Sequence, residues 1–271
     1  MRHVLWVGGP PGSGKTTVAI RLARRHGLRL YSADTRTWAH RDRALAAGNA
    51  AAHRWESLTP AERWQRSTPA EMFAMSLHRE RGPMVVDDLR ALPARPLIVA
   101  EGSALPSSAV SSGVAERARA VWLIPTRAFQ SARLAARGTT GGQARLYLLL
   151  GEVIEREAAE HGVPVLAVDG SAGIAGTSDA VERLFGAALA AGPRARTLGE
   201  RRALLREINQ AIAAQVRGYH ARPWAEGDPE AVVRAFVCEC GHPACDRYVS
   251  LAVGDLGAVP ALAPGHGRVS T

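Results

Sequence analysis

The sequence predicts an α/β protein in which a parallel sheet flanked by helices is followed by a small helical and cysteine-rich appendage. Short apolar runs of strand length alternate with longer helical segments as far as residue 191, which is typical of a parallel sheet. All three cysteines lie between Cys238 and Cys245, which indicates a compact C-terminal module. We therefore expect an α/β domain over residues 1–191 and a helix with a metal-binding module over residues 192–271.

The first predicted strand (residues 4–7) leads through a glycine-rich loop into a helix over residues 16–26. Residues 9–16 fit the phosphate-binding pattern G-x-x-x-x-G-K-[ST], whose glycines let backbone N–H groups surround phosphates at a helix N-terminus. In a nucleotide complex Lys15 would contact the β- and γ-phosphates of ATP, and the Thr16 hydroxyl would bind Mg²⁺. The predicted nucleotide-binding residues are Gly9, Pro10, Pro11, Gly12, Ser13, Gly14, Lys15, Thr16 and Thr17.

The overall composition limits the classes of partner. Lys15 is the only lysine among 34 lysine and arginine residues, so the chain keeps an ammonium group where arginine would not reproduce its shape. The net charge of +9 permits binding to nucleic acid, but no basic run or aromatic–basic interleaving marks an RNA-binding module, and the same field favours a phosphorylated small molecule. No apolar run approaches the roughly 20 residues that cross a bilayer, and the chain enters a strand almost at once, so we expect a cytoplasmic protein without a membrane partner.

The second predicted strand (residues 28–32) ends just before Asp34. Ligands of doubly wound sheets gather at the carboxyl ends of the strands, so Asp34 is placed to orient or deprotonate the hydroxyl group of a phosphoryl acceptor. The alternative is a helix cap for the segment that starts near Thr35. The sequence leaves both interpretations open.

Residues 36–82 predict a helical insert that covers this acceptor site. Residues 59–62 and 68–71 both read Thr-Pro-Ala-Glu, a capping box with proline at the first helical position. The tryptophans of the insert either line a pocket or form its own small core, and we expect the core for most of them. They are Trp38, Trp55 and Trp64.

The third predicted strand (residues 96–102) is a continuous apolar run that ends in Glu101 and Gly102. We expect Glu101 beside the glycine-rich loop, holding magnesium-bound water or acting as a base, because an unpaired carboxylate at a buried strand end is costly. The earlier run that ends in Asp87 and Asp88 superficially resembles a Walker B strand, but its apolar spacing fits a helix that ends before Pro93. These two aspartates remain reserve candidates for the acceptor pocket.

The fourth strand (residues 121–125) precedes an arginine-rich segment, residues 126–146, which is interrupted by the Gly-Thr-Thr-Gly-Gly sequence at 138–142. A glycine hinge among arginines favours a lid over the phosphates, in which Arg133 and Arg137 would neutralise the transferred group. The alternative is an ordinary solvated helix face.

The last part of the α/β domain contains the fifth strand, residues 163–168. The loop at 169–171 offers a place for an adenine ring. We expect Asp179 to begin the closing helix, which ends near residue 191.

With these parts in place, residues 1 to about 191 resemble the P-loop kinases of the adenylate-kinase-like branch. The resemblance rests on the loop at 9–16, on Asp34, on Glu101-Gly102, and on Arg133 with Arg137. It implies a P-loop NTPase sheet and transfer of the γ-phosphate of Mg-ATP to a hydroxyl or phosphate group of a small molecule, with Lys15 among the catalytic residues. The recognition motifs of nucleoside monophosphate kinases are missing, so the acceptor stays open. An ATP-binding regulatory switch with slow hydrolysis and a nucleic-acid end-processing kinase are the alternatives.

The C-terminal sequences at 236–245 and 263–266 resemble a cysteine-containing module of uncharacterised actinobacterial proteins, for which no activity is implied. The ligand types themselves suit structural Zn²⁺, and free thiols are the alternative. The predicted ligands are Cys238, Cys240, Cys245 and His266, with His242 as a competing fourth ligand. Residues 190–196 predict a linker, and the helix from 198 to 219 carries an apolar face for the α/β domain, the module, a protein partner or a second subunit.

Overall fold

The computed structural model describes residues 1–257 and 259–266. Five parallel strands form one sheet in the order β2-β3-β1-β4-β5, which confirms the predicted α/β architecture. The central strands are fully buried, as their continuous apolar sequences require. The strands are β1 (Val4–Gly8), β2 (Arg29–Ser32), β3 (Ile98–Gly102), β4 (Ala120–Pro125) and β5 (Val165–Val168).

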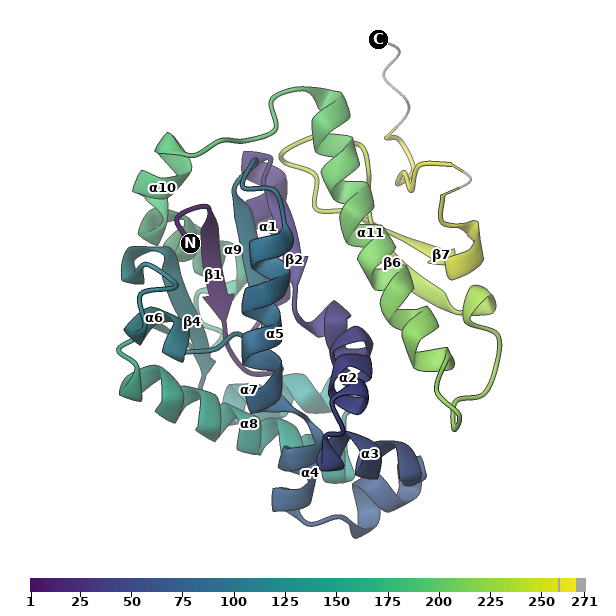
Figure 1. The fold of residues 1–271 in the computed structure, drawn as a ribbon. Helices are drawn as coiled ribbons and strands as arrows, with labels where there is room; N and C mark the ends of the chain where they lie inside the picture. The colour runs from purple at the N-terminus through teal and green to yellow at the C-terminus, as the bar shows by residue number, and fades with distance from the viewer. Residues whose placement is uncertain (258, 267–271) are drawn as a thin grey trace.

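Helices cover both faces of this sheet (Figure 1). One face packs Leu5 and Val7 of β1 against α1, α9 and α10, and the other packs Val4 and Trp6 against α5 and α8. The alternation of residues 4–7 between the two cores follows from the two-residue period of a strand. These helices are α1 (Lys15–His26), α5 (His78–Ala91), α8 (Gly141–Glu160), α9 (Gly173–Leu184) and α10 (Gly186–Ala191), and two smaller ones are α6 (Ser108–Ser111) and α7 (Arg127–Ala135).

The predicted helical insert forms a group of short helices beyond the carboxyl ends of the strands (Figure 1). Both Thr-Pro-Ala-Glu sequences make the expected reciprocal bonds, because Thr59 pairs with Glu62 and Thr68 pairs with Glu71. The insert contains α2 (Thr37–Ala46), α3 (Ala50–Ser57), η2 (Glu62–Arg66) and α4 (Pro69–Met75).

Two predictions about the remaining helices have different outcomes. The run that ends in Asp87 and Asp88 lies inside α5, so its prediction as a helix is confirmed. The prediction that Asp179 begins the closing helix is wrong, because α9 starts six residues earlier, at Gly173. Asp179 instead accepts a hydrogen bond of 3.1 Å from Arg25 of α1, and it joins the two helices through their side chains.

The C-terminal part begins with α11 (Leu198–His220). Thr197 and Glu200 form a capping box at the start of this helix. Leu205 and Ile208 of this helix pack together with Ile20 of α1 and Val237 of a β-hairpin, so the apolar face contacts both the sheet domain and the hairpin. The hairpin consists of β6 (Val233–Val237) and β7 (Tyr248–Ala252).

The connection between α10 and α11, which the sequence predicts as a linker, is held against the sheet domain. The N–H of Leu97 donates to Pro193 O, and the N–H of Ala195 donates to Gly27 O, each at 2.8 Å. Within the described residues, no helix is long and apolar enough to cross a membrane.

Candidate functional site

The glycine-rich loop joins β1 to α1 with a backbone that side chains would obstruct. Gly9, Gly12 and Gly14 have φ values of +139°, +91° and +87°, which favour glycine. A Cβ atom on Gly9 would lie 2.4 Å from Leu123 O. The side-chain amide of Gln130 donates to Pro11 O at 3.0 Å and attaches the loop to α7. The loop is therefore a preformed cradle at the N-terminus of α1.

Lys15 and Asp34 meet at the end of this loop. Lys15 is buried, and its Nζ lies 3.3 Å from Asp34 Oδ2. Asp34 Oδ1 also accepts a hydrogen bond from the N–H of Ser103 at 3.3 Å, and the side chain makes no helix-capping bond. Burial alone would raise the pKa of Asp34, but the charges of Lys15 and Arg81 hold it below its usual range. The carboxylate is therefore ionised at neutral pH.

Glu101 lies fully buried at the carboxyl end of β3. Thr16 Oγ1 donates to Glu101 Oε2 at 2.9 Å, and the Ser32 hydroxyl donates to the other oxygen. Burial, followed by the charge of Asp34, raises the pKa of Glu101 to about 7. A hydroxyl oxygen and a carboxylate side by side are ligand types that suit Mg²⁺.

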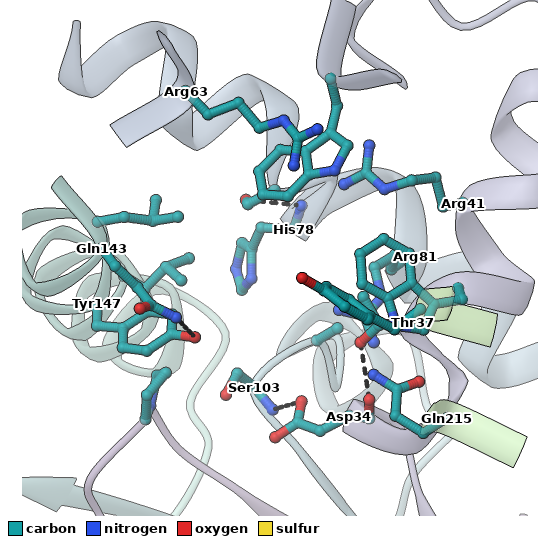
Figure 2. Close-up of a pocket in the computed structure, with 18 of the residues that line it drawn as sticks. Asp34, Thr37, Arg41, Arg63, His78, Arg81, Ser103, Gln143, Tyr147 and Gln215 are labelled. Atoms are coloured by element: carbon teal, nitrogen blue, oxygen red, sulfur yellow. Dashed lines mark hydrogen bonds between the residues drawn. The ribbon is translucent and has the colours of Figure 1, made fainter. Parts of the chain in front are cut away.

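Lys15, Thr16 and Asp34 lie at one side of a cavity of about 610 Å³, and Glu101 lies behind Thr16 rather than in the cavity wall. Figure 2 shows Asp34 and Ser103 at one end of it, and Arg41 and Arg63 at the other. Residues from the loop, the insert, α8 and α11 all contribute to its walls. The cavity therefore joins segments that are far apart in the sequence, and the C-terminal part of the chain forms one of its sides.

The tryptophans of the insert line this cavity, so the expectation that most of them form a separate core is wrong. Trp38, Trp55 and Trp64 are all part of its wall. The guanidinium of Arg41 lies 4.5 Å from the ring centre of Trp55, and that of Arg63 lies 3.8 Å from the ring centre of Trp224. An indole ring that stacks on an arginine guanidinium lies next to a charged group. A purely apolar core contains no such group.

Several residues that line the cavity were not predicted from the sequence. Arg41 follows Thr37 by one helical turn, Arg81 follows His78, and Tyr219 follows Gln215. This i, i+3 or i, i+4 spacing of polar side chains was the available indication that each pair shares one helix face. The missed lining residues include Arg41, Arg63, His78, Arg81, Ser103, Gln143, Tyr147, Gln215, Tyr219 and Trp224.

The predicted lid consists of α7, a short loop and the start of α8. Arg137 lines the cavity, and Arg133 Cβ lies 3.7 Å from the position of a Cβ on Gly12. Among the described residues neither arginine makes an ion pair, whereas Arg127 of the same segment pairs with Glu152. Arg137 thus lines the cavity, whereas Arg133 is an exposed residue whose Cβ lies close to Gly12 of the loop.

The reserve candidates lie elsewhere. Asp87 is exposed, and Asp88 accepts hydrogen bonds from Tyr31 at 2.8 Å and from His40 at 2.9 Å. Neither aspartate belongs to the cavity wall as the structure describes it. The charge of Asp88 stabilises the contact between β2, α2 and α5.

A second site lies in the C-terminal module. The ligand atoms of Cys238, Cys240, Cys245 and His266 all lie within 4.8 Å of one another. His266 Nδ1 is 3.4 Å from Cys238 Sγ and 3.6 Å from Cys245 Sγ, close to the sulfur–nitrogen edge of about 3.6 Å that a tetrahedral zinc site requires. His242 Nδ1 instead accepts from the N–H of Ala244. The cluster can hold a metal ion such as zinc.

The Cys₃His cluster is attached to the helix that carries Lys15. Arg24, in the last turn of α1, donates to Cys238 O at 3.0 Å and to Cys245 O.

Comparison with family models, curated proteins and solved structures gave no match. Function is therefore inferred from the side chains of the two sites.

Proposed function

We propose that the protein is an ATP-dependent phosphotransferase that moves the γ-phosphate of Mg-ATP to a hydroxyl or phosphate group of a small molecule. One observation carries the proposal: Lys15 and Thr16 of the glycine-rich loop lie at a cavity wall beside two carboxylates, Asp34 and Glu101. This combination suits a P-loop nucleotide site next to an acceptor site.

The loop fits a triphosphate on steric and electrostatic grounds. Its three positive-φ glycines keep the backbone free of side chains where phosphate oxygens would approach. The N-terminus of α1 adds the positive end of its dipole. Lys15 would bind the β- and γ-phosphates, and Thr16 with Glu101 would hold Mg²⁺ directly or through water. The metal ion would neutralise charge on the phosphates.

Asp34 is the proposed base. Without nucleotide its carboxylate pairs with Lys15, and a triphosphate would compete for that lysine and leave Asp34 free for the acceptor. A bond would form between the acceptor oxygen and the γ-phosphorus, the bond to the ADP oxygen would break, and the acceptor proton would pass to Asp34. Arg133 and Arg137 would neutralise the transferred group as the lid segment approaches.

Zinc is the metal we propose for the Cys₃His cluster, in a structural role. Three thiolates and one imidazole satisfy a four-coordinate ion without an open position for water or substrate. The cluster would then join the hairpin to the segment at 263–266. No step of phosphate transfer involves it.

Transfer of labelled γ-phosphate tests the proposed reaction. Wild-type protein is incubated with Mg-ATP and a fractionated pool of small molecules, with RNA and DNA ends in a separate arm. We expect a labelled small molecule from the wild type, and a loss of at least about 100-fold for Lys15→Ala. Arg21→Ala, on the same helix, is the matched control and should keep full activity. Label in nucleic-acid ends alone would identify an end-processing kinase.

A regulatory switch is the second candidate, because α1 carries Lys15 in its first turn and bonds the Cys cluster through Arg24 in its last turn. This route would let nucleotide occupancy reach the C-terminal module. Tight ATP binding by the wild type without any labelled product would overturn the phosphotransferase and favour the switch.

A further inference from the structure

The cavity contains more cationic charge than its own carboxylates neutralise. Five cationic side chains line it, against the single carboxylate of Asp34. Lys15 already pairs with that carboxylate, and Arg137 comes from the lid segment. The other three cations come from the insert and α5: Arg81 lies near Asp34, and the remaining two are Arg41 and Arg63.

Arg41 is the least neutralised of these three. Its side chain is 3% exposed, and Nη2 donates to Met75 O at 2.7 Å. Among the described residues, Nε and Nη1 have no hydrogen-bond partner. Burial lowers the pKa of Arg41 to about 10. The nearby carboxylate of Glu56 accepts from Trp224 at 2.7 Å and from Arg222 at 3.5 Å, so it is already engaged.

Arg63 and Arg81 differ from Arg41 because each donates two hydrogen bonds to neighbouring protein atoms. Arg63 donates twice to Leu58 O, at 3.0 and 2.6 Å. Arg81 donates to Ala33 O and to His40 Nδ1. Their guanidinium groups raise the positive potential around Arg41, while Arg41 keeps free donors.

Other unsatisfied polar atoms gather in the same place. In the described part of the chain nine buried side-chain nitrogen or oxygen atoms lack a partner, and five of them belong to residues that line this cavity. Buried polar groups are normally hydrogen-bonded, so these atoms call for partners that a ligand or water in the cavity would supply. The five atoms are Arg41 Nε, Arg41 Nη1, Trp55 Nε1, Ser103 Oγ and Gln215 Oε1.

We propose that the second substrate is a hydroxyl-bearing organic anion with a planar apolar body, whose carboxylate or phosphate group binds Arg41 while its hydroxyl group lies at Asp34. This inference rests on the proposed phosphotransferase. Asp34 and Arg41 are seven residues apart along η1 and α2, which separates their backbones by roughly 10 Å, enough for a ring between the two groups. Trp38, Trp55 and Tyr219 provide aromatic surface along that path.

The chemistry of the anionic end follows from the free donors. Arg41 Nε and Nη1, with Trp55 Nε1, offer N–H groups that suit the oxygens of a carboxylate or a phosphate monoester. Hydrogen bonds to a charged group in a buried site contribute more than neutral ones, so charge at this end should govern affinity.

Binding of matched probes tests the inference. The probes are 4-hydroxybenzoate, 4-hydroxyphenyl phosphate and the neutral 4-hydroxybenzamide, titrated by calorimetry into the full chain with a saturating non-hydrolysable Mg-ATP analogue and without it. We expect one or both anions to bind at least about tenfold more tightly than the amide, and the stronger of the two identifies the anionic group. Equal affinity for all three probes would overturn the inference.

Arg41→Gln should reduce the affinity for the anions to that of the amide while the affinity for the ATP analogue changes less than about twofold. Arg43→Gln, on the exposed side of the same helix, is the matched control and should bind as the wild type does. If Arg41→Gln fails to bind the ATP analogue, Arg41→Lys replaces it, because lysine keeps the charge but not the fork and should still lose about tenfold. Full anion affinity in the variant that folds would overturn the inference.

These outcomes separate the two proposals. Phosphate transfer to a neutral acceptor, unaffected by Arg41→Gln, would contradict the anionic substrate and leave the phosphotransferase intact. Arg41-dependent anion binding in a protein that binds no ATP would contradict the phosphotransferase and leave the anion site.

Discussion

Glu101 is an acidic residue of the candidate site whose pKa lies well above its ordinary value. It is fully buried, and burial raises its pKa to about 7. A folded-state pKa above the ordinary value means that the contribution of this group to stability is complete below pH 4.5 and is lost as the pH rises through about 7. The carboxylate that the proposed Mg²⁺ site needs therefore destabilises the metal-free fold at neutral pH.

Glu101→Gln should separate these two effects. Without magnesium, we expect the variant to be more stable than the wild type at pH 8 by up to about 2–3 kcal/mol and to show a flatter pH dependence between pH 5 and 8. Phosphate transfer should fall by about 100-fold or more, because the magnesium ligand or base is lost. Urea unfolding at several pH values measures the first effect. Glu160→Gln, exposed at the end of α8, is the control, and identical pH profiles for wild type and Glu101→Gln would contradict the prediction.

At the scale of single residues, the sequence predicted the residues beside the glycine-rich loop better than those on the other walls of the cavity. Lys15 and Asp34 follow strands that periodicity alone identifies, and Glu101 lies at the end of another, so their common location was predictable. Arg41 and Gln215 lie on α2 and α11, 174 positions apart in the chain. Their meeting depends on how α11 packs against the sheet, which no local pattern encodes.

At the scale of elements, close packing fixes how the lid segment meets the insert. A Cβ atom on Gly142, at the start of α8, would lie 2.0 Å from Trp64 O of η2. Arg145 of the same helix donates to that oxygen at 3.4 Å. The backbone of η2 therefore rests directly on α8, and this contact closes one side of the cavity.

Gly142→Ala should force these two elements apart. We expect a loss of about 1–3 kcal/mol in the free energy of unfolding, together with weaker binding at the cavity. The control is Gly199→Ala in α11, where an added Cβ meets nothing within 4 Å and alanine should be neutral or stabilise by up to about 1 kcal/mol. Urea denaturation measures the free energy of unfolding of both variants. Equal values would show that η2 moves away from α8 without a loss of stability, which would contradict the prediction.

Asn209 attaches the hairpin to α11. It is fully buried, its Nδ2 donates to Val237 O at 2.9 Å and to Glu239 Oε1 at 2.8 Å, and its Oδ1 accepts from the N–H of Val237. The Asn209 side chain thus forms hydrogen bonds with both backbone groups of Val237, at the end of β6, as the backbone of a neighbouring strand would. The sequence predicted the apolar face of this helix, but a polar residue within that face gave no indication of its partner.

Asn209→Leu should leave those groups buried and unpaired. We expect a loss of about 3 kcal/mol or more, since each unsatisfied buried group costs about 1–3 kcal/mol. Hydrogen exchange of the β6 amides should increase more than that of β1. Gln210→Leu, at the exposed neighbouring position, should change stability by less than about 0.5 kcal/mol. Unchanged protection of β6 in Asn209→Leu would contradict this account of the attachment.

At the scale of the whole molecule, two helices connect the Cys₃His cluster with the cavity. The first turn of α1 carries Lys15 and its last turn carries Arg24, and the 12 residues between its ends span about 18 Å. Arg202 and Arg206 of α11 bond residues of the cluster segment, whereas Gln215 and Tyr219 near its other end line the cavity. The strands and the apolar faces of the helices followed from sequence periodicity. This connection did not, because it depends on docking between distant segments.

Removal of the metal should therefore affect both ends of the molecule. We expect protein loaded with zinc to bind one ion per chain, and stripping it should increase hydrogen exchange first in β6, β7 and residues 238–245. Binding at the cavity should weaken by several-fold, because the wall formed by Gln215 and Tyr219 loses the support of the cluster.

The two histidines give the sharpest form of this last prediction. His266→Asn removes a ligand whose nitrogen lies 3.4 Å from Cys238 Sγ, and it should lower zinc affinity on the order of 100-fold. His242→Asn alters a ring that bonds Ala244 N and stays outside the cluster, so zinc affinity should be retained. Competition with a chromogenic chelator measures both affinities. Loss of zinc in His242→Asn with retention in His266→Asn would reverse the ligand assignment, and equal cavity binding with and without metal would show that the two sites act independently.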